Sequence, residues 1–269
     1  MTRTMKRVRS GVTALTIPTL TMIATAPALA AEVPVDLSTW TAEGYGNSYN
    51  WVLESGNDTV RQTVNGSPTV FYSDFNAFGN QLSGTIRVNT SSDDDFVGFV
   101  IGFNPGDLTA ESTDFLLIDW KQLNQNFYGF APAGLAISHV SAGLADNAGA
   151  WSHDPALGVT ELARGATLGS TGWGDNVTYN FDIAFTASNI KVWVDDVLQF
   201  DLDGTFSDGR FGFYNYSQAQ VIYAGITNEV LPPPPPAVPE PATWGMMIGG
   251  LALVGSVLRR QRGYRVHFA

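Results

Sequence analysis

The middle of the chain is a succession of short runs in which apolar and polar residues alternate. Residues 178–185 read T-Y-N-F-D-I-A-F, which places Phe181, Ile183 and Phe185 on one face of an extended strand. No amphipathic helical pattern interrupts these runs between residues 31 and 230. Turn-forming stretches separate them, such as N-G-S-P at 65–68 and N-P-G-D at 104–107. The pattern predicts an all-β domain.

Eleven such runs give the expected strands. They are Thr59–Val64, Thr69–Ser73, Gln81–Asn89, Phe96–Phe103, Phe115–Trp120, Leu135–Val140, Tyr179–Phe185, Ile190–Val194, Gln199–Leu202, Arg210–Tyr216 and Val221–Ile226. This many strands without an internal repeat predict a two-sheet sandwich, and a jelly roll of the kind found in many lectins is the preferred architecture. A smaller immunoglobulin-type sandwich is the alternative.

Charge and cysteine content exclude several classes of function. The chain has no cysteine, so it has neither disulfides nor thiolate metal sites. Its formal net charge is −11, and residues 31–238 hold six basic residues against 24 acidic ones, a formal charge of −18. Such a surface repels nucleic-acid phosphates, so no nucleic-acid partner is expected. Divalent cations are its natural counterions.

The first thirty residues have the organisation of a secretory signal peptide. Four basic residues precede residue 10, a short apolar run follows, and A-P-A-L-A closes the segment. Ala28 and Ala30 are the small residues before the expected cut, so residues 1–30 are predicted to be removed after Ala30. An uncleaved anchor is the alternative.

The other end carries a second targeting segment. Residues 231–241 form a proline-rich linker, in which five consecutive prolines favour a stiff polyproline II spacer. Residues 242–258 are free of charge, and their helix would be about 25 Å long, which predicts a transmembrane helix. The basic residues that follow predict a cytoplasmic tail over 259–269.

The order of motifs in this segment resembles a PEP-CTERM sorting signal. V-P-E-P-A-T-W, with Pro239, Glu240 and Pro241, is followed by the apolar helix and then by a basic cluster, R-R-Q-R. That cluster contains Arg259, Arg260 and Arg262. The resemblance implies recognition by an exosortase and export across the inner membrane of a Gram-negative bacterium. A plain single-span membrane anchor is the alternative.

Three adjacent aspartates, Asp93, Asp94 and Asp95, stand directly before an apolar run. Carboxylates held this close repel one another, and a bound cation would relieve the repulsion. Carboxylate oxygens are the ligands that Ca²⁺ prefers. In a straight strand Asp93 and Asp95 would share a face and Asp94 would point away, whereas a turn would bring all three together. A solvated acidic loop without an ion is the alternative.

Several blocks of sequence resemble the C-terminal lectin-like domain of thrombospondins. They are D-D-D-F-V-G-F-V-I-G-F at 93–103, D-F-L-L-I-D-W-K-Q at 114–122, G-L-A-I at 134–137, G-W-G-D-N-V-T-Y at 172–179 and G-R-F-G-F-Y-N-Y-S-Q at 209–218. The resemblance covers roughly residues 90–226, with 36–90 supplying the first strands, and it assigns residues 31–230 to one domain. It implies a jelly roll with bound calcium, and it makes Asp93, Asp94 and Asp95 the calcium ligands.

The sequence favours binding over catalysis. The domain has only two histidines, His139 and His153, no G-x-S-x-G motif, and six scattered glutamates instead of an E-x-D-x-E strand. We therefore predict a non-enzymatic adhesion module at the cell surface or in the biofilm matrix that binds calcium and carbohydrate or exopolysaccharide. A coat protein without a specific ligand is the main alternative, and a polysaccharide-active enzyme is the less favoured one. Four tryptophans are expected either to stack on sugar rings or to belong to the core: Trp40, Trp51, Trp151 and Trp173.

Overall fold

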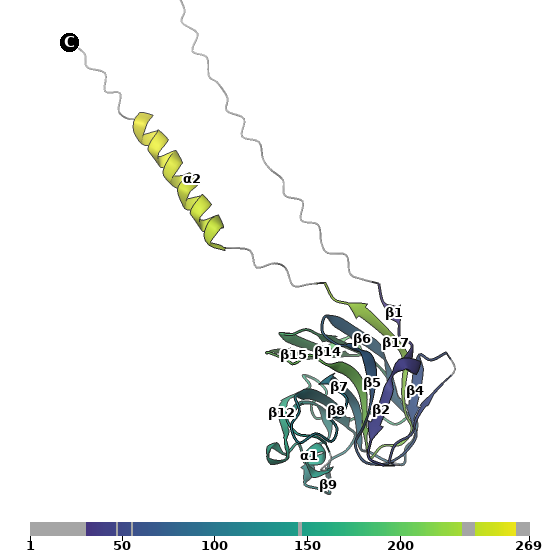
Figure 1. The fold of residues 1–269 in the computed structure, drawn as a ribbon. Helices are drawn as coiled ribbons and strands as arrows, with labels where there is room; N and C mark the ends of the chain where they lie inside the picture. Colours follow the sequence, from purple (N-terminus) through teal and green to yellow (C-terminus); the bar gives the residue numbers. More distant parts are fainter. Residues whose placement is uncertain (1–30, 47, 55, 145–146, 233–239, 262–269) are drawn as a thin grey trace, which may run out of the picture.

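The computed structural model describes residues 31–46, 48–54, 56–144, 147–232 and 240–261. The predicted signal peptide, with Ala28 and Ala30, lies outside these residues, as do Pro239 and Arg262. Two antiparallel sheets face each other (Figure 1). The prediction of a mostly-β two-sheet sandwich is therefore confirmed.

One sheet has eight strands and the other has seven. The first runs in the spatial order β15 (Val197–Asp203), β14 (Asn189–Val194), β13 (Thr178–Phe185), β6 (Asn80–Val88), β17 (Val221–Val230), β4 (Thr59–Gln62) and β3 (Trp51–Leu53), with β1 (Val33–Pro34) paired to β17. The second runs β12 (Val159–Arg164), β11 (Gly134–Val140), β8 (Phe115–Lys121), β7 (Phe96–Phe103), β16 (Arg210–Tyr216), β5 (Thr69–Asn76) and β2 (Thr41–Gly44). A separate hairpin joins β9 (Gln125–Asn126) to β10 (Phe130–Ala131).

Every strand expected from the alternating pattern is present. Phe96–Phe103 and Arg210–Tyr216 begin and end where the pattern predicts, and the others differ by a few residues at their ends. The pattern missed the shorter strands β1, β2, β3, β9 and β10 and the edge strand β12. These segments bury few side chains, so pairing with a neighbour defines them more than an apolar face does.

Aromatic side chains fill the space between the sheets. Tyr223 stacks on Phe213 with ring centroids 4.2 Å apart, and Phe99 packs on Phe181 at 4.5 Å. The buried hydroxyl of Tyr223 lies 2.9 Å from the carbonyl oxygen of Gly98, so the polar end of this ring is satisfied inside the core.

A second apolar cluster lies on the outer face of the seven-stranded sheet. Phe96, Leu117 and Tyr214 contribute to it, and Trp151 of the short helix α1 (Asn147–Ser152) covers them. In Figure 1, α1 and β9 lie together beside β8 and β12. Strand β7 is consequently buried on both faces, which explains its continuous apolar sequence.

The C-terminal apolar run forms helix α2 (Glu240–Gln261), as expected, with Glu240 and Pro241 at its start and Arg259 and Arg260 in its last turn. In the described part of the chain, however, no helix has both the length and the apolar character needed to cross a membrane. This finding corrects the prediction of a transmembrane helix over 242–258. Glycines and Ser256 interrupt the uncharged run and lower its apolar character.

Candidate metal centre

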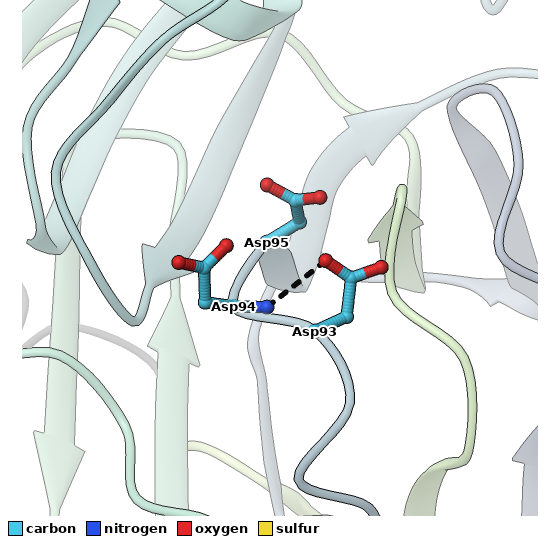
Figure 2. A group of neighbouring side chains, drawn as sticks. All are labelled: Asp93, Asp94 and Asp95. Atoms are coloured by element: carbon cyan, nitrogen blue, oxygen red, sulfur yellow. Dashed lines mark hydrogen bonds between the residues drawn. The ribbon is translucent and has the colours of Figure 1, made fainter.

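The three aspartates lie in the turn that leads into β7. One carboxylate oxygen from each of Asp93, Asp94 and Asp95 lies within 4.8 Å of the other two. The backbone N–H of Asp94 donates to Oδ1 of Asp93 at 3.1 Å, and Figure 2 shows the three side chains leaving this single turn. The straight-strand arrangement, in which Asp94 points away, is therefore wrong, and the turn that the sequence left open is the one observed.

The electrostatics of the turn are unfavourable for three free carboxylates. Burial and the neighbouring charge of Asp95 raise the pKa of Asp93. Burial also raises the pKa of Asp94, against the opposing effect of the Lys121 ammonium. The fold thus holds negative charges together where water screens them poorly, which is the condition that a bound cation relieves.

Lys121, at the end of β8, is buried beside the triplet. Its side chain is 1% exposed, and its Nζ lies 2.7 Å from Oδ1 of Asp95. The ammonium also lies 4.8 Å from the ring centroid of Phe96 and 4.6 Å from that of Trp151. One carboxylate is therefore paired within the protein, and the remaining two negative charges match one divalent cation.

The triplet is connected to an exposed aromatic hairpin. Gln125 of β9 donates from Nε2 to Oδ1 of Asp94 and accepts a hydrogen bond from Lys121. Beyond Gln125, the residues Phe127, Tyr128 and Phe130 are 72%, 45% and 60% exposed. The aromatic hairpin, residues 123–131, therefore presents apolar rings to solvent next to the acidic turn.

A second buried ion pair lies on the same sheet. Nε2 of His153 is 2.8 Å from Oδ2 of Asp119, and its Nδ1 is 3.0 Å from Oε2 of Glu161. Arg164 donates to the same oxygen of Glu161. Burial alone lowers the pKa of His153, but the charges and hydrogen bonds of Asp119 and Glu161 raise it to about 9. The hydrogen bonds from His153 and Arg164 outweigh burial and lower the pKa of Glu161 to about 2. His153 is thus held as a buried cation.

The tryptophans are not the sugar-facing residues that one interpretation of the sequence suggested. Trp40, Trp151 and Trp173 are 6%, 4% and 3% exposed, and the half-buried Trp51 stacks on Phe71. The exposed rings lie instead in N-F-Y-G-F at 126–130, a stretch that no alternating pattern marks. Lys121 directly follows the expected strand Phe115–Trp120 and extends β8, but its partner Asp95 could not be identified from the sequence.

Comparison with known proteins gives two matches to family models. The thrombospondin C-terminal region matches residues 47–230, and the PEP-CTERM protein-sorting motif matches residues 237–262. Thrombospondin-3b of Danio rerio is 28% identical over 198 residues, which cover 66% of this chain and 20% of that protein. Cartilage oligomeric matrix protein of Bos taurus is 27% identical over 207 residues, covering 68% and 26%. The chain thus spans about a fifth to a quarter of the length of these relatives.

Among solved structures, the carbohydrate binding module CBM66 from Bacillus subtilis has a similar fold. Its TM-score is 0.50 at 12% sequence identity, and the match covers 71% of this chain and 95% of that one. At this identity the similarity concerns the sandwich alone.

Proposed function

Because this chain belongs to the thrombospondin C-terminal region family, we propose that it is an exported adhesion module that binds calcium and carbohydrate. The observation that carries the proposal is the acidic turn, where three carboxylates converge and only one is paired with a buried ammonium. Asp93 and Asp94 would supply ligand oxygens. Asp95 would add the carboxylate oxygen that is not paired with Lys121. Bound Ca²⁺ would neutralise the turn and fix the chain as it enters β7.

The carbohydrate part of the proposal has separate support. The sandwich resembles that of a carbohydrate binding module, although a shared fold does not by itself fix a ligand. The exposed rings of the aromatic hairpin offer apolar faces on which sugar rings stack, and Gln125 connects this hairpin to Asp94. Calcium binding would therefore also order the surface that contacts sugar.

Calcium is expected to raise the melting temperature of the protein. If the Kd is about 10 μM, 1 mM Ca²⁺ adds about 2.7 kcal/mol to the free energy of unfolding. For a domain of this size the midpoint rises by roughly 5–11 °C. The measurement compares thermal melts of the full chain in 1 mM Ca²⁺ and in chelator.

The variant Asp93→Asn should lose this rise. Asp196→Asn is the matched control, because Asp196 is an exposed acid in the β14–β15 turn and the substitution changes the net charge equally. An equal calcium effect in both variants, or none in the wild-type chain, would reduce the triplet to a solvated acidic turn. A coat protein without a specific ligand would then be the better description.

We propose binding without catalysis, in keeping with the scattered glutamates of the domain. A glycan array incubated with the full chain, once with calcium and once with chelator, separates the candidates. Retention of glycans that is lost with chelator supports the adhesion module. Calcium binding without glycan retention supports the coat protein, and shortening of the bound glycans would reveal an enzyme.

The sorting motif supports processing by an exosortase and delivery to the cell surface or matrix of a Gram-negative bacterium. Replacing Pro239, Glu240 and Pro241 by alanine is expected to leave the C-terminal segment attached. Intact-mass measurement of the exported protein checks this, because a processed chain lacks the mass of that segment. Equal masses for wild type and variant would show that processing does not use this motif.

A further inference from the structure

A cavity of about 370 Å³ opens at one end of the sandwich, away from the acidic turn. Its lining includes Thr160 and Leu162 of β12 and Asp203 of β15. These two edge strands lie on the same side of the molecule (Figure 1). Leu116, Phe185 and Phe206 form part of its apolar wall, whereas Asp114, His139 and Ser207 bring polar groups to it. We call this space the end cavity. Its volume is at the lower end of the range of small-molecule sites, about 300–1,000 Å³.

The strand register explains why the space is not filled. One inward-facing row of the seven-stranded sheet crosses Phe99, Ile118, Ile137 and Ala163, all apolar. In the next row of cross-strand neighbours, Ile101 and Leu116 are apolar, but His139 and Thr160 are polar. These polar side chains occupy positions where apolar side chains would extend the core. The two sheets therefore do not pack tightly against each other at this end.

The polar groups of the end cavity are preorganised. Nε2 of His139 lies 2.8 Å from Oδ1 of Asp114, and the hydroxyl of Ser207 donates to Oδ2 of the same carboxylate. The hydrogen bonds from Ser207 and His139 lower the pKa of Asp114, so this group is charged at neutral pH. Asp203 adds a second carboxylate to the cavity lining. Nδ2 of Asn189 donates to its Oδ1 at 2.9 Å.

This chemistry selects the class of ligand. Two carboxylates disfavour anions, and the apolar wall disfavours small, strongly hydrated ions. A neutral saccharide satisfies both conditions, because its hydroxyls donate to carboxylates while the C–H face of its ring packs on apolar and aromatic side chains. The volume suits a short saccharide and excludes a folded partner.

We propose that the end cavity is a saccharide subsite for a neutral mono- or disaccharide unit, with Asp114 and Asp203 accepting its hydroxyls. This inference rests on the proposed carbohydrate binding and assigns a place for it that is separate from the aromatic hairpin. The apolar wall near Phe206 would support the sugar ring, and Leu162, which is 49% exposed on β12, would lie at the entrance.

The test uses the full chain and a panel of neutral mono- and disaccharides, with Kd measured by calorimetry. Leu162→Trp narrows the entrance without removing a hydrogen bond, and Asp114→Asn removes the charged acceptor at nearly constant size. Asp114→Asn loses a hydrogen bond to a charged group, and Leu162→Trp excludes the sugar from the cavity. Each variant is therefore expected to weaken saccharide binding by tenfold or more. Val52→Trp is the matched control, because Val52 is 42% exposed on β3, the opposite edge of the eight-stranded sheet.

The outcomes separate this inference from the proposed function. Weakening by both cavity variants, with normal binding by Val52→Trp, supports the end cavity. Binding that survives both cavity variants overturns this inference and leaves the proposed function in place. Failure of the wild-type chain to bind any saccharide overturns both. Melting temperatures close to that of the wild type show that the variants are folded.

Discussion

Replacing Lys121 by methionine is expected to lower the free energy of unfolding by about 3–5 kcal/mol. Methionine retains the apolar stem, but it leaves the carboxylate of Asp95, which is 4% exposed, without its partner at 2.7 Å. It also removes the cation that lies over the rings of Phe96 and Trp151. An uncompensated buried charge costs more than the pair contributes, so the loss exceeds that of an ordinary ion pair.

Urea unfolding at pH 7 in chelator measures this loss. Lys191→Met is the matched control, since Lys191 binds Asp201 at 3.2 Å with both side chains about 40% exposed. Such a surface pair contributes about 0–1 kcal/mol. Similar losses in the two variants would show that the pair of Lys121 and Asp95 is not the buried interaction described above.

The same variant tests the charge balance of the acidic turn. Without Lys121, three carboxylates share the turn without an internal cation, so Ca²⁺ should stabilise the variant more than it stabilises the wild-type chain. Thermal melts of both proteins with calcium and with chelator give the two shifts. A smaller calcium shift in Lys121→Met would mean that Lys121 helps to hold the calcium ligands in place.

The second large effect concerns the buried cation His153 and appears as pH dependence. Its pKa is raised from its ordinary value of 6.5 to about 9, so the folded state binds this proton more tightly than the unfolded state. The resulting stability is fully present below about pH 6.5 and is lost as the pH rises through about 9. At about 1.4 kcal/mol per pH unit, the contribution is roughly 3 kcal/mol.

Asp119→Asn should remove most of this contribution. The amide has no charge to hold the imidazolium, and burial alone lowers the pKa of His153. We expect the pKa of His153, followed by NMR, to fall by about two pH units. The free energy of unfolding, measured with urea, should fall between pH 6 and pH 9 for the wild-type chain. It should change much less for the variant, which lacks this contribution at both pH values. An unchanged pKa in Asp119→Asn would show that Glu161 alone holds the charge.

Asp114→Asn is the control for that measurement. His139 and Asp114 form a similar pair at 2.8 Å, but their side chains are 39% and 61% exposed. Water screens this pair, so the pH dependence of stability between pH 6 and pH 9 should stay close to that of the wild-type chain.

Much of the architecture could be predicted because it depends on local patterns. Alternation at Phe181, Ile183 and Phe185 marks a strand with one buried face, and these three side chains do lie in the core between the sheets. The acidic triplet was identifiable because three like charges next to a buried strand are costly without a cation. The short strands and the aromatic hairpin carry no such local signal.

The apolar run near the C-terminus illustrates the limit of a local pattern. The uncharged stretch over 242–258 correctly predicted a helix, and α2 contains it. Its predicted membrane crossing was not confirmed among the described residues, because absence of charge does not ensure sufficient apolar character. The sorting motif itself was identified correctly, since it depends on the order of short motifs.

By itself, the sequence determined the all-β sandwich, the acidic triplet and the two families that the chain resembles, because periodicity and short motifs are encoded by neighbouring residues. Only the tertiary structure decided that Lys121 neutralises Asp95 and that His153 is held between Asp119 and Glu161. It also decided that His139, Asp114 and Ser207 meet at the end cavity. These partners are many residues apart in the chain, and strand register brings them together through packing that no local pattern records.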